Sequence, residues 1–174
     1  MWHLAEHLGI AVVPLSDLSR EAPEAVSYFG SRGKSVFSGV TVFEGTRRMI
    51  VFNDAHAAGR QASNIAHELS HGLLHHPRAP AMDGLGCRFW NRELEDEANW
   101  LSGALLVPEE ATLLIVQRDW CVKEAAAKDG VTPTMIRFRI NVTGARVRVQ
   151  RSQARYAGFR GSKRRDDSVE GESK

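Results

Sequence analysis

The sequence predicts an α+β fold in which a small antiparallel sheet is followed by a helical C-terminal half. Two observations lead to this prediction. Runs of β-branched and aromatic residues, which are typical of strands, lie before residue 53. Beyond that point, apolar residues recur at the three- and four-residue spacing of helices. Strands that come first and helices that follow indicate α+β architecture.

The N-terminal elements are expected to be short. Residues 2–8 can form two helical turns that Gly9 ends, and residues 10–13 are a short apolar strand. Proline and glycine interrupt residues 17–33, so we expect a loop there with one short helix.

A β-hairpin is expected next. Two runs of β-branched and aromatic residues, 36–43 and 49–52, flank the turn sequence Glu-Gly-Thr-Arg at 44–47. A turn this short joins strands that pair antiparallel.

Helical spacing begins after the hairpin. Asn53 or Asp54 can cap a long helix that runs to residue 75 or 76, where Pro77 would end it. A loop rich in proline and glycine then leads to a second helix over residues 93–106.

The remaining helices form a predicted helical hairpin over residues 109–141. Pro108 and the two acids after it are typical of a helix start. Residues 121–128 form a further helix, and a tight turn at Gly130 precedes a last helix that Thr132 can cap.

Charge is unevenly distributed along the chain. The 23 Lys and Arg residues and 21 Asp and Glu residues leave a net charge of only +2. Residues 137–165, however, contain Arg and Lys but no Asp or Glu, and apolar periodicity is lost beyond Gly144. We therefore expect residues 1–144 to form the domain and residues 145–174 to be a basic, disordered tail. Its charge can attract an acidic protein or, without sequence choice, a nucleic acid.

Composition indicates an ordinary globular protein, with 43% hydrophobic and 25% charged residues in a chain of 174. No apolar run approaches the roughly 20 residues that a membrane-spanning helix needs. The two cysteines, Cys87 and Cys121, lie far apart and indicate no disulfide framework. We expect a cytoplasmic protein without a membrane partner.

The motif that carries chemistry is His67-Glu68-Leu69-Ser70-His71, an HExxH sequence inside the predicted long helix. Four residues make about one helical turn, so both imidazoles project from one face and can share one Zn²⁺ ion. Glu68 is then placed to act as a general base towards water that the zinc activates. Gly72 follows directly, and a glycine at such a position indicates that another element packs closely there.

A catalytic zinc site needs a third protein ligand, which we expect on the second helix. Glu95 and Glu97 flank its apolar stripe almost symmetrically, so periodicity does not choose between them. Asn99, one turn after Glu95, can hydrogen-bond a ligand histidine, whereas the residue one turn after Glu97 is Leu101. Glu95 is therefore the favoured ligand.

Residues 64–75 (NIAHELSHGLLH) and 95–108 (EDEANWLSGALLVP) resemble the signature of the ImmA/IrrE family of zinc metallopeptidases. The resemblance implies a zincin-like fold, with the zinc site within residues 60–106. It implies that His67, His71 and Glu95 hold one Zn²⁺ per chain and that Glu68 is the catalytic base. The implied activity is that of a cytosolic endopeptidase that cleaves a helix-turn-helix transcriptional repressor of a phage or mobile element.

Other histidines need separate interpretations. The reversed motif HxxEH at residues 3–7 lies in a short terminal helix without an obvious third ligand, and we expect no metal there. His75 lies one further turn along the metal-binding face, where it could stabilise an oxyanion, but lining a cleft is the favoured role. His76 is expected to be a solvated helix end.

Two other classes of function compete with peptide hydrolysis. The chain could be a non-proteolytic regulator that binds a repressor without cutting it. It could also bind DNA through the C-terminal helices and the arginine-rich tail. The side chains that would have to read bases, Ile136, Phe138 and Ile140, have the character of packing residues, which favours a helical hairpin that closes the core.

Overall fold

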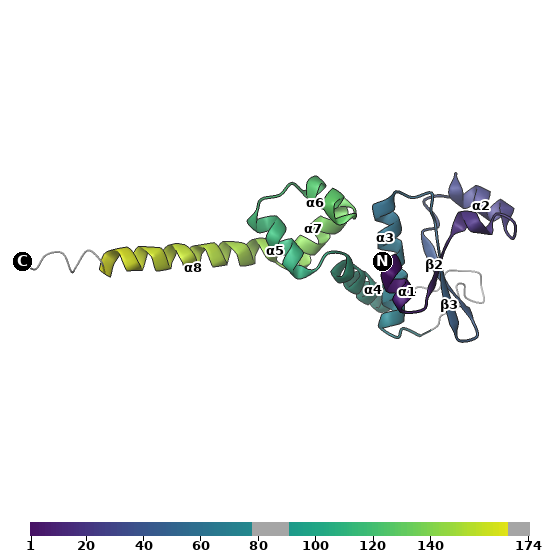
Figure 1. Ribbon diagram of the computed structural model, residues 1–174, viewed down its shortest axis with the longest axis horizontal. Helices are drawn as coiled ribbons and strands as arrows, with labels where there is room; N and C mark the ends of the chain where they lie inside the picture. Colours follow the sequence, from purple (N-terminus) through teal and green to yellow (C-terminus); the bar gives the residue numbers. More distant parts are fainter. Residues whose placement is uncertain (78–90, 167–174) are drawn as a thin grey trace, which may run out of the picture.

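The computed structural model describes residues 1–77 and 91–166, and it confirms the α+β prediction. A small sheet with helix α3 lies at one end of the molecule, helices α5, α6 and α7 cluster in the middle, and α8 runs away from them (Figure 1). In the part of the chain described, no helix combines the length and the apolar character needed to cross a membrane.

The sheet has three strands in the order β1 (Ala11–Pro14), β3 (Arg47–Phe52) and β2 (Gly39–Glu44). The predicted hairpin is present: β2 and β3 pair antiparallel around a turn at Gly45, whose φ is 58°. β1, however, pairs parallel to β3, so the expectation of a purely antiparallel sheet was wrong.

The long connection after β1 explains the parallel pair. It contains a 3₁₀ helix (Leu15–Leu18) and α2 (Pro23–Gly30), and it returns the chain to the far edge of the sheet, where β2 begins. Because β2 and β3 are joined by a tight turn, β3 then runs back between β2 and β1, parallel to β1.

One apolar cluster lies between α1 (Trp2–His7), the sheet and α3 (Ala58–Leu73). Its fully buried members include Ile50 from the central strand and Ile65 and Leu69 from α3. The two α3 residues are four positions apart and lie on the helix face opposite the two histidines of the HExxH motif. Burial of this stripe therefore fixes which face of α3 the histidines occupy.

Helix α3 begins later than predicted because Asn53 has a different role. Its side chain is fully buried, and its amide donates to the carbonyls of Phe29 (2.9 Å) and Phe37 (3.0 Å). Its side-chain oxygen accepts from the backbone N–H of Ala55 (3.1 Å). Asn53 therefore holds the loop before β2 to the end of β3, and the helix cap falls at Ala57.

A second apolar cluster joins α4 (Arg92–Leu106), α5 (Glu109–Gln117), α6 (Val122–Asp129) and α7 (Pro133–Val142). The predicted turn is present: Gly130 has φ 65°, and the Thr132 hydroxyl accepts from the Met135 N–H at 3.2 Å. Ile136 and Ile140 are buried in this cluster, as expected for packing residues. Phe138 is 36% exposed and lies against Gly103 of α4.

Arg139 joins the two halves of the helical region. It is only 3% exposed, and its Nε donates to the carbonyl of Val107, at the end of α4, at 2.9 Å. Burial lowers the pKa of its guanidinium, and the charge of Glu109 acts in the opposite direction. The C-terminal end of α4 is thus fixed to α7.

Of the segment 145–174, which was expected to be a disordered tail, residues 145–166 form helix α8 (Ala145–Asp166), and residues 167–174 lie outside the described residues. Ala145 and Val149, one turn apart, are buried, and Arg148 forms an ion pair with Glu109 of α5. These contacts anchor the first turns, and the rest of the helix is rich in Arg, which has high helix propensity. The lack of an apolar stripe in this segment therefore indicated a solvent-exposed helix rather than a disordered chain.

Candidate metal centre

Helices α3 and α4 pack against each other, and each carries part of the site. His67 and His71 lie one turn apart on α3, with ring centroids 4.8 Å apart and Nε2 atoms 3.1 Å apart. Gly72, which follows His71, lies against the guanidinium of Arg48 from β3, and a side chain there would displace it. The close packing inferred from this glycine is therefore confirmed.

Glu95 of α4 completes the group. Its Oε2 lies 3.2 Å from His67 Nε2, and its Oε1 lies 3.8 Å from His71 Nε2. The side chains are 16–24% exposed, so solvent or a substrate can reach them. The structure therefore brings together the three residues that the sequence nominated as metal ligands.

The donor set fits a zinc ion. Two imidazole nitrogens and a carboxylate oxygen are typical protein ligands of a catalytic zinc. Ligands about 2.0–2.1 Å from a tetrahedral ion are about 3.3 Å from one another. One ligand atom from each of the three residues can be chosen so that all lie within 4.8 Å of one another, and the nearest are 3.1 Å and 3.2 Å apart. A small displacement of the three side chains would meet the requirement.

Asn99 lies where the sequence predicted it, one turn after Glu95 and beside a histidine of the group. Its Oδ1 is 3.1 Å from His67 Nδ1. An amide oxygen can only accept, so His67 Nδ1 carries the ring proton and Nε2 keeps its lone pair. Asn99 therefore orients His67 with Nε2 towards Glu95.

The expectation for His76 was wrong. Its side chain is only 6% exposed, its Nδ1 lies 2.8 Å from His71 Nδ1, and its Nε2 lies 3.0 Å from Glu97 Oε2. The residue one turn after Glu97, Leu101, had offered it no partner. Glu97 instead contacts His76, which in turn contacts His71. Helical periodicity could not show this because His76 lies beyond the end of α3.

The backbone at the end of α3 explains the position of His76. His75 has φ 55°, the left-handed conformation, and its N–H donates to Gly72 O at 3.2 Å. The His76 N–H donates to His71 O at 3.0 Å. This pair of hydrogen bonds is the Schellman motif, which folds the chain back over the last helical turn. It places His76 beside His71 and leaves His75 exposed, off the helix face where spacing had placed it.

Glu68 is held from the sheet. The hydroxyl of Thr41, on β2, donates to Glu68 Oε2 at 2.6 Å, and a Cβ at Gly39 would lie 3.7 Å from Glu68 Cγ. Strand β2 thus passes in contact with the carboxylate. Thr41 was not predicted, because no local pattern indicates which strand residue faces a helix residue distant in sequence.

The remaining site predictions have simple outcomes. In the described residues, His67, His71 and Glu95 are the group of histidine, cysteine and acidic side chains with the spacing of a metal site. His3 and Glu6 of the reversed motif lie 3.7 Å apart with both side chains fully or largely exposed. Cys87 and most of the loop between the two helices lie outside the described residues.

Comparison with known proteins identifies a family. The family model Peptidase_M78, described as the IrrE N-terminal-like domain, matches residues 5–141. No curated protein and no solved structure matches the chain. The matched range contains the sheet, both helices of the site and the helical cluster up to α7.

Proposed function

Because the chain belongs to the Peptidase_M78 family, whose members share the IrrE N-terminal-like domain, we propose that it is a zinc-dependent endopeptidase. The observation that supports the proposal best is the convergence of His67, His71 and Glu95. Two imidazoles and a carboxylate are the ligand set of a catalytic rather than a structural zinc, because they leave a coordination position open.

His67, His71 and Glu95 would hold the zinc ion. Bound there, the ion supplies Lewis-acid chemistry, which polarises the scissile carbonyl and makes water a better nucleophile. Glu68 is the proposed general base: its carboxylate takes a proton from the attacking water and passes it to the nitrogen of the leaving amine. The hydrogen bond from Thr41 orients this carboxylate.

We also propose that the substrate binds as an extended strand along β2. The sheet order leaves β2 with β3 as its neighbour on one side. The Asn53 N–H donates to Ser38 O, so the pairs 40/51 and 42/49 are the hydrogen-bonded ones and 41/50 is not. The backbone N–H and C=O of Thr41 therefore point away from β3, towards the edge that a peptide can extend.

The β2 proposal predicts a two-residue pattern in the substrate. A cleavable peptide would be made as a series in which each backbone amide in turn is N-methylated. The cleavage rate should decrease when every second amide along the peptide is methylated and stay unchanged for the amides between, because successive amides of a strand point to opposite sides. Uniform sensitivity, or none, would argue against strand addition.

The proposed substrate is a helix-turn-helix transcriptional repressor of a phage or mobile element, encountered in the cytoplasm. An adjacent gene for such a repressor would nominate the protein to use. The purified chain and the repressor would be incubated with and without a zinc chelator, and the products measured by mass spectrometry. Cleavage at a defined bond that chelation abolishes supports the proposal.

Glu68→Gln separates hydrolysis from regulation by binding alone. The change preserves shape but removes the proton acceptor, so cleavage should fall by at least about 100-fold while zinc content stays at one ion per chain. Glu110→Gln, at an exposed position of α5, is the matched control. Repressor inactivation that survives Glu68→Gln would favour the non-proteolytic regulator.

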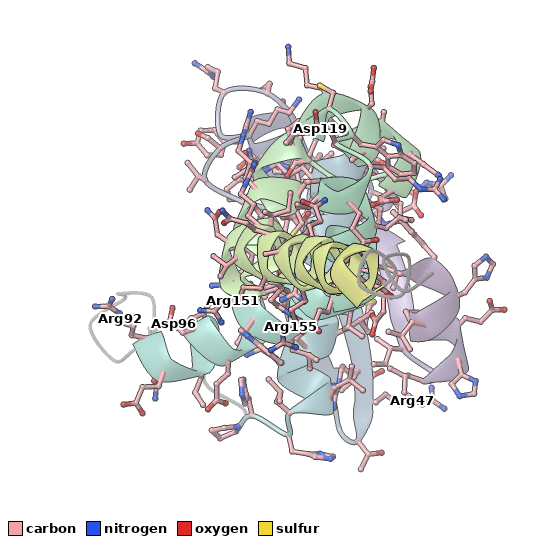
Figure 2. The ribbon with its side chains drawn as sticks, turned by 90° about the vertical axis from the view of Figure 1, so that its left-hand side faces the viewer. Arg47, Arg92, Asp96, Asp119, Arg151 and Arg155 are labelled. Carbon is pink, nitrogen blue, oxygen red and sulfur yellow. The ribbon has the colours of Figure 1, made fainter. Side chains whose placement is uncertain are left out.

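A contact with a polyanion is the second candidate function, and α8 favours it. Arg151 and Arg155 are exposed, and Figure 2 shows both beneath the axis of that helix. Sequence-specific reading by α7 is disfavoured because Ile136, Arg139 and Ile140 are buried. A gel-shift titration against salt, with Arg151→Gln/Arg155→Gln as the variant, should show weak, salt-sensitive binding that the variant reduces if the contact exists.

A further inference from the structure

A chain of three side chains runs behind the proposed metal site. His71 Nδ1 lies 2.8 Å from His76 Nδ1, and His76 Nε2 lies 3.0 Å from Glu97 Oε2. His76 is almost fully buried between its two partners, whereas the Glu97 side chain is 61% exposed. The three groups therefore connect the site to the surface of α4 through two hydrogen bonds.

The positions of the protons follow from the partners. When zinc is held by the three proposed ligands, His71 binds it through Nε2, the atom that lies near His67 Nε2 and Glu95, so the proton of the neutral ring is on Nδ1. His71 Nδ1 then donates to His76 Nδ1, which must lack a proton. The proton of His76 is therefore on Nε2, and it is donated to the Glu97 carboxylate, which can only accept.

From this arrangement we infer that Glu97 and His76 are positioning residues for His71. The inference rests on the proposed zinc site. Glu97 fixes the tautomer of His76, and His76 fixes both the tautomer and the ring orientation of His71. A histidine that donates to a polarised acceptor is also a more basic ligand. The Glu97 carboxylate thus strengthens metal binding without contacting the metal.

The two proposed ligand histidines are held by different means. His67 donates to the Asn99 amide, whose oxygen accepts without help from a further residue. An imidazole such as His76, by contrast, can present either a donor or an acceptor at Nδ1. The carboxylate of Glu97 removes this ambiguity, which gives a physical reason for an acidic residue at that position.

Zinc affinity of the full chain tests the inference. Affinity would be measured by chelator competition for wild type, Glu97→Ala, Glu97→Gln, His76→Phe and the double variant Glu97→Ala/His76→Phe. Loss of partners behind a metal ligand typically weakens binding about 10- to 100-fold. We expect such a loss for Glu97→Ala and His76→Phe. We expect a smaller loss for Glu97→Gln, whose amide oxygen can still accept.

Asp96→Ala is the matched control, because it removes a neighbouring carboxylate of similar exposure. Asp96 is 71% exposed and lies 3.7 Å from Arg92 near the start of α4, where Figure 2 shows both side chains. Zinc affinity of this variant should equal that of wild type. An equal loss for Asp96→Ala and Glu97→Ala would mean a general effect of negative charge, and it would overturn the relay.

The double variant supplies the sharper criterion. If Glu97 acts through His76, removing Glu97 has no further effect once His76 is gone, so the double variant should match His76→Phe within about twofold. Independent, multiplying losses would overturn the inference. So would unchanged affinity in Glu97→Ala, a surface substitution that leaves the core intact.

Two further measurements separate the relay from other causes. Without metal, Glu97→Ala should melt within about 2 °C of wild type. A merely structural role of Glu97 would instead lower the melting temperature of this variant. Wild type must also bind one zinc that Glu95→Ala loses. Absence of that zinc would refute the metal centre and the relay together, whereas normal wild-type binding with unaffected relay variants would refute the relay alone.

Discussion

Replacing His75 by glycine should stabilise the protein and leave zinc binding unchanged. His75 has φ 55°, a conformation that costs an ordinary residue about 1–2 kcal/mol and glycine almost nothing. Glycine gives back about 0.5–1 kcal/mol through the greater freedom of its unfolded chain. The expected net gain is therefore about 0.5–1 kcal/mol, or about 1–4 °C in melting temperature for a chain of this size.

The opposite substitution, His75→Val, supplies the contrast. A β-branched residue is poorly accommodated at positive φ, so the turn that ends α3 should open or strain. The variant should melt several degrees below wild type. Because the same turn places His76 beside His71, the zinc affinity of this variant should also fall.

The assay is thermal denaturation followed by circular dichroism, run on metal-free protein so that zinc binding does not contribute. Zinc affinity is measured separately by chelator competition. If His75→Gly instead weakened zinc binding or cleavage by tenfold without lowering the melting temperature, the His75 side chain would belong to the site. A melting temperature of His75→Gly at or below that of wild type would refute the backbone explanation of the turn.

Three further predictions follow from contacts in the structure. Wild type should gain about 4 kcal/mol of stability when free zinc reaches about 1,000 times its dissociation constant, and calorimetry of Glu95→Ala should show most of that gain lost. Thr41→Val removes a hydrogen bond to a charged group, which is worth about 1.5–3 kcal/mol, so kcat/KM should fall about 10- to 150-fold with zinc content unchanged. Thr41→Ser should retain most activity. A fully active valine variant would contradict the role of the hydroxyl. A Cβ at Gly59 would lie 2.9 Å from the Val131 backbone, so Gly59→Ala should lower the free energy of unfolding, measured by urea titration, by about 1–3 kcal/mol. Gly30 has open space around it, so Gly30→Ala should be neutral or stabilising in the same titration.

The site contains some relations that a single helix determines and others that depend on how two helices pack. His67 and His71 share a face because they are one helical turn apart, and Asn99 lies one turn from Glu95 for the same reason. Both relations are properties of a regular helix and can be predicted before any packing is known. Which carboxylate of α4 contacts the histidines depends on how α4 lies across α3, and for that choice the sequence offered only the indirect argument from Asn99.

The errors lie where the chain leaves regular periodicity. His76 was expected in solvent because a single positive φ at His75 changes the direction of the chain. Asn53 was expected to cap a helix, but its buried side chain bonds the carbonyls of Phe29 in α2 and of Phe37 in the loop before β2. In both cases the side-chain environment is set by residues far away in sequence, and an isolated turn or cap pattern does not specify it.

The sequence alone determined the α+β class, the HExxH helix, the resemblance to a peptidase family and the turn at Gly130, because each depends on residues within a few positions of one another. Tertiary structure decided that β1 runs parallel to β3, that Thr41 holds Glu68, and that Glu97 reaches His71 through His76. The physical reason is that hydrogen bonds and burial between distant elements depend on how those elements pack. Helical and strand periodicity determines only the face that each element presents for packing.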